Sequence, residues 1–128
     1  MKLKNKVAIV TGGGKGIGEE ISLGLAKEGA KVVVADLDKE NSSNVVKEIL
    51  KNSGEAIYVE TDVSNEASVK NLISETINRF DQIDILINNA GIRHVKKLEN
   101  HDLSDWNDMI SVNPVSYTHL TLPTIVGV

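Results

Sequence analysis

Apolar residues follow two alternating patterns along the chain. Four short runs of mostly apolar, β-prone residues are typical of strands buried on both faces: Lys6–Thr11, Lys31–Asp36, Ala56–Val59 and Ile83–Ile87. Between these runs, apolar residues recur at the spacing of amphipathic helices, in stripes around Ile17–Ala26, Val45–Leu50 and Val69–Phe80. Strands that alternate with helices predict an α/β fold, a doubly wound parallel sheet with helices on both faces.

Capping residues set the expected helix ends. Gly29 is predicted to end the first helix, because glycine tolerates the left-handed backbone that follows a helix. Asp62 or Ser64 is predicted to cap the third helix. A further short helix is expected around Ser104–Val112, capped by Ser104.

Composition narrows the classes of partner. The 128 residues carry a net charge of −4 with both signs interspersed, which argues against nucleic acid as a partner. There is no Cys, and His94, His101 and His119 lack metal-ligand spacing, so no metal site is predicted. No apolar run has the length of a signal-peptide core or a membrane span, so we expect a cytoplasmic protein without a membrane partner.

A glycine-rich segment lies between the first predicted strand and the first predicted helix. It runs Thr11-Gly-Gly-Gly-Lys-Gly-Ile-Gly18, with glycines at 12, 16 and 18. Such glycines allow a sharp turn and let a pyrophosphate approach the helix N-terminus, where free N–H groups favour negative charge. The alternative is a flexible turn without a ligand, which the position between strand and helix disfavours.

Asp36 ends the second predicted strand, about 20 residues beyond the glycines, the spacing at which a carboxylate accepts hydrogen bonds from the adenosine ribose. A carboxylate there would repel a 2′-phosphate, which favours NAD over NADP as cofactor. Lys15 argues the other way, since a cation in the loop could attract that phosphate, so NADP stays the alternative. Asp36 could also serve only to end a strand in a turn.

Four motifs in order resemble the short-chain dehydrogenase/reductase family over Lys4–Asn113: the glycine segment, Asp62-Val63, Asn88-Asn-Ala-Gly91 and Trp106-Asn-x-x-Ile-x-Val-Asn113. The resemblance implies a cofactor site formed by Gly12, Lys15, Gly16, Ile17, Gly18, Asp36, Asp62, Val63, Asn89, Ala90 and Gly91. In it, residues 12–18 line the pyrophosphate and nicotinamide half, Asp36 binds the ribose and Asp62-Val63 border the adenine. Without the resemblance, Asp62 could be only a helix cap and Asn88-Asn89 only a strand-ending turn.

The resemblance also implies an activity, hydride transfer between a nicotinamide and an alcohol or carbonyl substrate, of the 3-oxoacyl-carrier-protein reductase or sugar and polyol dehydrogenase kind. Asn113 matches the asparagine of the family's catalytic tetrad. The family's Tyr-x-x-x-Lys is absent, since Asp62 and Thr121 follow the two tyrosines at that spacing, and no catalytic serine is identified. We therefore expect a Rossmann-type sheet truncated after about four strands, inactive by itself, from a protein that forms homo-oligomers at full length.

The end of the chain differs in composition from the rest. No residue from Met109 to Val128 is charged, and both prolines fall there. Residues 115–124, Val-Ser-Tyr-Thr-His-Leu-Thr-Leu-Pro-Thr, look like the in-frame translation of a transposase sequencing adapter. We therefore expect residues 1–113 to be the N-terminal part of the dinucleotide-binding domain, and residues 114–128 to be a non-native tail.

Two other interpretations compete with an enzyme fragment. A stand-alone dinucleotide-binding half-domain without catalysis would keep the glycine segment and Asp36. A nucleotide-dependent transferase would use the glycine segment but leave Asp62-Val63 and Asn88–Gly91 unexplained. The isolated chain is expected to fold poorly, because four strands leave apolar surfaces and a sheet edge without partners.

Overall fold

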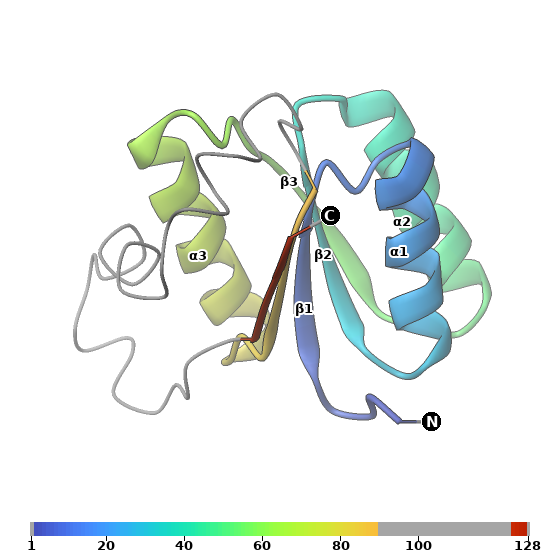
Figure 1. The fold of residues 1–128 in the computed structure, drawn as a ribbon. Helices are drawn as coiled ribbons and strands as arrows, with labels where there is room; N and C mark the ends of the chain where they lie inside the picture. The colour runs from blue at the N-terminus through green and yellow to red at the C-terminus, as the bar shows by residue number, and fades with distance from the viewer. Residues whose placement is uncertain (1, 90–123, 128) are drawn as a thin grey trace.

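The computed structural model describes residues 2–89 and 124–127 and contains one parallel sheet. Its strands are β1 Val7–Thr11, β2 Lys31–Asp36, β3 Ala56–Glu60, β4 Ile85–Asn88 and β5 Thr124–Gly127. They lie in the order β3-β2-β1-β4-β5 (Figure 1). The chain is an α/β protein with a Rossmann-like sheet, as the apolar pattern predicts.

The order of the strands reverses at β1. From β1 the chain builds outward through β2 to β3, then returns across the sheet to place β4 on the other side of β1. In open parallel sheets, ligands bind at such a reversal, outside the carboxyl ends of the strands. The end of β1 therefore marks where a site is expected.

In the part of the chain that the structure describes, three helices cover the two faces of the sheet. Helices α1 (Gly16–Lys27) and α2 (Lys39–Lys51) lie on one face, and α3 (Glu66–Phe80) lies on the other (Figure 1). Strand β1 supplies both interfaces, because alternate side chains point to opposite faces: Val7 and Ile9 join the core under α3, and Ala8 and Val10 join the core under α1 and α2. β1 is therefore buried along its whole length.

The predicted elements agree with the structure except at their ends. Gly29, with a φ of 97°, follows the first helix as predicted and donates its N–H to the Ala26 carbonyl. The predicted cap of the third helix was wrong: Asn65, not Asp62 or Ser64, is its N-cap and accepts a hydrogen bond from the Ser68 N–H. The helix expected around 104–112 lies outside the described residues.

A fifth strand was not predicted. β5 pairs in parallel with β4, with Ile85 opposite Thr124 and Asn88 opposite Gly127. It falls in the segment that the sequence analysis expects to be a non-native tail. Its first three residues, Thr124, Ile125 and Val126, are β-branched, which is typical of β-strands whatever their origin.

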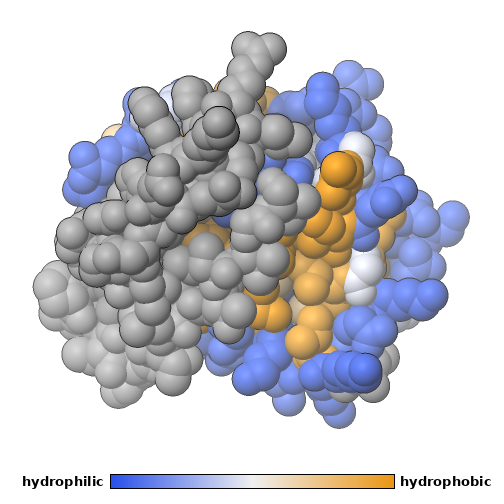
Figure 2. Space-filling view, viewed as in Figure 1, coloured by the Kyte–Doolittle hydropathy of each residue, from blue (hydrophilic) through white to orange (hydrophobic). Residues whose placement is uncertain are grey.

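Hydrophobic residues remain at the surface. Figure 2 shows a hydrophobic band on the face in view, beside hydrophilic residues on one side and grey atoms on the other. Among residues 2–89, three large apolar side chains are more than half exposed: Ile17, Leu37 and Leu50. Ile17 lies in the first turn of α1, next to the glycine-rich loop.

Candidate dinucleotide-binding site

The loop from Gly12 to Lys15 joins β1 to α1 at the reversal of the sheet. Gly12 and Gly16 have φ angles of 64° and 60°, in the left-handed region that favours glycine. The Gly12 N–H donates to the Ala35 carbonyl at 2.7 Å, which ties the loop to the end of β2. The loop thus turns sharply and aims the start of α1 at the carboxyl edge of the sheet.

Gly18 is required by close packing. A Cβ at this position would collide with the Gly12 carbonyl oxygen and lie 2.6 Å from Asn89 Nδ2. The Asn89 Nδ2 in turn donates to the Gly12 oxygen at 3.1 Å. The first turn of α1, the glycine loop and the residue after β4 therefore meet at one point.

Ser22 supports the loop from beneath and was missed by the sequence analysis. Its buried hydroxyl lies 2.9 Å from the Gly18 carbonyl oxygen and 3.3 Å from the Gly13 carbonyl oxygen. A polar residue within the apolar stripe of the first helix was the only signal for it. It fixes the loop without facing the space above it.

The Asp36 carboxylate is held in two places. Its Oδ2 accepts from the Gly14 N–H and its Oδ1 from the Asp38 N–H, both at 3.0 Å. The Tyr58 hydroxyl donates to the Asp36 carbonyl oxygen at 3.0 Å. Both interpretations from the sequence are therefore compatible with the structure: Asp36 closes a turn and also presents its carboxylate at the glycine loop.

Lys15 lies in the loop near a second acidic residue. Asp38 caps α2, and its pKa is lowered mainly by hydrogen bonds from the Asn41 backbone N–H and side-chain amide, with a smaller contribution from the charge of Lys15. Lys15 itself is exposed. The positive charge that would favour a 2′-phosphate is thus partly offset by a neighbouring carboxylate.

Thr11 joins the ends of β1 and β4. Its Oγ1 accepts from the Asn89 N–H at 3.0 Å and lies 3.3 Å from both the Ile87 carbonyl and Asn88 Oδ1. Thr11, Asn88 and Asn89 are all buried. Asn88, the last residue of β4, and Asn89 after it therefore do more than end the strand in a turn, since they contact the end of β1 and Asn89 also bonds the glycine loop.

We predict that Thr11→Val lowers the free energy of unfolding by about 1–3 kcal/mol, because the buried Asn89 N–H loses this acceptor. Chemical denaturation followed by circular dichroism measures it. Thr76→Val is the control: that hydroxyl is also buried but bonds only the Leu72 carbonyl within α3, so we expect less than about 1 kcal/mol. Equal losses in the two variants would contradict the role assigned to Thr11.

Asp62 and Val63 follow β3 at the same edge of the sheet. Asp62 Oδ1 accepts from the hydroxyl and the backbone N–H of Ser64 at 2.6 and 2.9 Å, and these bonds lower the Asp62 pKa. The Asp62 N–H donates to Ser68 Oγ at 2.8 Å. Both residues are partly exposed, and Asp62 shapes the turn before α3 rather than capping it.

The remaining predicted site residues, Ala90, Gly91 and Asn113, and all three histidines lie outside the described residues. Within the ranges 2–89 and 124–127, no group of acidic residues, histidines or cysteines is arranged to hold a metal ion. No helix in this part of the chain is long and apolar enough to cross a membrane.

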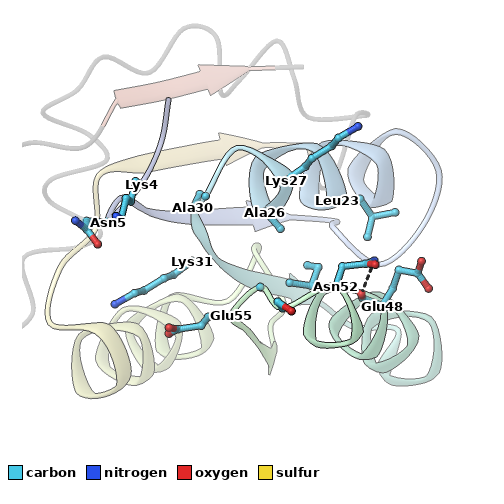
Figure 3. Close-up of a pocket in the computed structure, with 14 residues that line it drawn as sticks. Lys4, Asn5, Leu23, Ala26, Lys27, Ala30, Lys31, Glu48, Asn52 and Glu55 are labelled. Atoms are coloured by element: carbon cyan, nitrogen blue, oxygen red, sulfur yellow. Dashed lines mark hydrogen bonds between the residues drawn. The ribbon is translucent and has the colours of Figure 1, made fainter. Parts of the chain in front are cut away.

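A groove of about 640 Å³ lies at the opposite end of the sheet. It is lined by residues that precede β1, β2 and β3 and by the ends of α1 and α2 (Figure 3). Among its charged side chains, Lys31 and Glu55 point to one side of the view, and Lys27 and Glu48 point to the other (Figure 3). The groove therefore lies away from the glycine loop, and its charged side chains do not converge on one point.

Comparisons with known proteins agree with this geometry. A family model described as short chain dehydrogenase matches residues 6–125. The chain is 43% identical over 112 residues to the 3-oxoacyl-[acyl-carrier-protein] reductase of Synechocystis sp., covering 87% of this chain and 45% of that protein. The chain spans 43–46% of the length of the curated relatives it matches.

Solved structures share the fold. The hydroxysteroid dehydrogenase from Escherichia coli matches with a TM-score of 0.74 and 33% identity, covering 85% of this chain and 48% of that one. The 3-ketoacyl-(acyl-carrier-protein) reductase from Brucella melitensis, complexed with NADH, matches with a TM-score of 0.65 and 44% identity, covering 70% and 36%. The parallel sheet, the glycine loop at its reversal and the family match together show that the chain belongs to the short-chain dehydrogenase family.

Proposed function

We propose that this chain is the dinucleotide-binding half of an NAD(P)-dependent oxidoreductase that transfers a hydride between the nicotinamide and an alcohol or carbonyl substrate. The observation that carries the proposal is the contact between the glycine loop and Asp36 at the reversal of the sheet, through the Gly14 N–H. The family's complexes with NAD and NADH, in Burkholderia phymatum and Brucella melitensis proteins, support it.

The phosphate side of the proposed site is formed by backbone groups. Helix α1 begins at Gly16 with no side-chain cap, so its first N–H groups are available to an anion. A Cβ at Gly16 would meet open space, so a ligand can approach the backbone there, and exposed Lys15 adds a positive charge. These residues suit a pyrophosphate, which the dipole of α1 would also stabilise.

Asp36 would bind the adenosine ribose. A carboxylate has about four acceptor positions, and two of those on Asp36 are used by Gly14 and Asp38. The remaining acceptor capacity suits a ribose hydroxyl, whereas a 2′-phosphate would be repelled. We therefore propose NAD as the preferred cofactor and NADP as the alternative, with Lys15 the only described residue in the loop that favours the latter.

Further residues would border the rest of the cofactor. Asn89 is buried, and among the described residues its Oδ1 has no hydrogen-bond partner, which suits a polar ligand group beside the loop. With Ala90 and Gly91 it would border the nicotinamide half, and Asp62 and Val63 would border the adenine. The nicotinamide, when bound, would supply the hydride-transfer chemistry.

Catalysis is proposed to require residues beyond these 128. Asn113 would be the one member of the catalytic tetrad present, because the sequence contains no Tyr-x-x-x-Lys. Relatives that act on 3-oxoacyl-carrier-protein substrates support a carbonyl substrate of that kind, with a sugar or polyol as the alternative. We propose that the chain alone binds the cofactor without turning over substrate.

Isothermal titration of the purified chain with NAD⁺ and with ADP-ribose tests the proposed function. We expect both to bind, because the glycine loop and Asp36 contact the part that they share. NADP⁺ should bind at least about tenfold more weakly, from the charge repulsion at Asp36. A folded chain that binds none of the three would contradict the proposal.

The same preparation tests the proposed inactivity of the chain by itself. NADH oxidation with a 3-oxoacyl thioester, followed at the absorbance of NADH, should show no rate above the background. Measurable turnover that is lost together with cofactor binding would contradict the proposed inactivity of the chain by itself. A stand-alone binding half-domain is favoured instead if a gene with this natural end encodes a stable monomer that binds NAD⁺.

A further inference from the structure

The hydroxyl of Ser42 is buried without a hydrogen-bond partner among the described residues. Ser42 lies in the first turn of α2, has no exposed surface, and uses its N–H on the Asp38 carbonyl at 3.1 Å. A buried hydroxyl without a partner costs about 1–3 kcal/mol, whereas alanine would occupy the same place without that cost. A serine here therefore calls for an acceptor.

The Ser42 hydroxyl faces the glycine loop beside Asp36. A Cβ on Gly14 would collide with Ser42 Oγ, and it would lie 2.9 Å from Asp36 Oδ2 and 3.1 Å from the Ser42 nitrogen. The loop, the end of β2 and the start of α2 thus converge on the α-carbon of Gly14. This explains why the third glycine of the segment, Gly14, has no side chain.

The Asp36 carboxylate is an acceptor suited to the Ser42 hydroxyl, because both lie next to the α-carbon of Gly14. Asp36 Oδ2 accepts from the Gly14 N–H, which leaves it further acceptor capacity on the same side. Hydrogen bonds to an ionised acceptor are about twice as strong as those between neutral groups. A donor on the inner side of Asp36 would fix the carboxylate in place and leave one acceptor position, on Oδ1, for a ribose hydroxyl.

We propose that Ser42 is a positioning residue for ribose recognition, whose hydroxyl donates to Asp36 Oδ2 in the nucleotide-bound protein. The inference rests on the proposed function and adds a residue to the specificity of the same site. Ser42 is buried beneath Gly14 and acts on the ligand only through Asp36. It therefore favours an unphosphorylated ribose, and its loss weakens that preference.

The test compares two ligands that differ only at the ribose, ADP-ribose and 2′-phospho-ADP-ribose, by isothermal titration of the full chain. Ser42→Ala should weaken ADP-ribose binding about three- to tenfold, which is the effect of one hydrogen bond. The affinity for 2′-phospho-ADP-ribose should stay unchanged. Ser43→Ala is the matched control: this neighbouring serine on α2 is only partly buried and should change neither affinity by more than about twofold.

The same substitution in an Asp36→Asn protein separates a positioning role of Ser42 from a packing role. In an Asp36→Asn protein, Ser42→Ala should no longer change the ratio of the two affinities, because the ionised acceptor is gone. Ser42→Cys keeps the approximate volume but offers a weaker donor, so its ratio should lie between those of serine and alanine.

The outcomes are distinct. Unchanged ratios in Ser42→Ala, or equal weakening of both ligands, would overturn the positioning role and leave Ser42 as a small residue packed on Gly14. The same effect of Ser42→Ala in the Asp36→Asn background would overturn it too. Failure of the folded wild-type chain to bind either ligand would instead overturn the proposed function and the inference with it.

Discussion

Gly18→Ala is expected to weaken binding of ADP-ribose at least about 100-fold, the largest effect predicted for this chain. A Cβ at position 18 would collide with the Gly12 carbonyl oxygen and crowd Asn89 Nδ2. The nearest obstacle is backbone, which has no rotamer to adopt, so the loop or the start of α1 must move. Either movement takes the backbone N–H groups away from the positions that suit a pyrophosphate.

Gly24→Ala is the matched control on the same helix. A Cβ at Gly24 would meet no atom within 4 Å, and alanine favours a helix by about 1 kcal/mol over glycine. We expect Gly24→Ala to bind ADP-ribose as the wild type does and to unfold at a higher temperature. Overpacking at Gly18 should instead lower stability by about 1–3 kcal/mol. Unchanged affinity in a folded Gly18→Ala protein would contradict the proposed site.

Asp36→Ala should have the second largest effect, on cofactor choice. We expect affinity for NAD⁺ to fall about 10- to 100-fold, because the ribose loses its acceptor and the N–H groups of Gly14 and Asp38 lose theirs. Affinity for NADP⁺ should stay level or rise, since removal of the carboxylate ends its repulsion of the 2′-phosphate and leaves Lys15 nearby. Titration of both cofactors measures the ratio.

Glu60→Gln is the control for this variant. Glu60 lies opposite Asp36 in the register of β2 and β3, and it is exposed. Its substitution removes one negative charge from the same end of the sheet without touching the glycine loop. An equal fall in the NAD⁺ to NADP⁺ ratio would show that general charge, and not the Asp36 carboxylate, sets the preference.

Local sequence was sufficient for most elements of the described fold. The first four strands and three helices follow from runs and stripes of apolar residues, because the pattern of apolar positions that marks a buried face can be read within each segment. Helix ends were less certain. Asn65 caps α3 in place of Asp62 or Ser64 because the Ser64 groups bind Asp62, which holds that residue in the preceding turn.

The candidate site was predictable where one short segment carries it. The glycine spacing at 12, 16 and 18 and the position of Asp36 after a strand were both visible in the sequence. The supporting residues Ser22 and Ser42 were not, because a serine in an amphipathic stripe looks the same whether it fills space or bonds the loop. Only the packed structure shows which carbonyl or α-carbon each one faces.

By itself, the sequence determined the α/β class, the glycine loop before a helix and an acidic residue at the end of the second strand, since each depends on contacts within a few residues or on one repeating pattern. The tertiary structure decided what those segments meet. β4 returns to lie beside β1, which brings Thr11 to Asn89, and the Asp36 carboxylate reaches the Gly14 N–H across 22 positions. These contacts depend on strand order, and strand order is set by the burial of the whole sheet rather than by any local pattern.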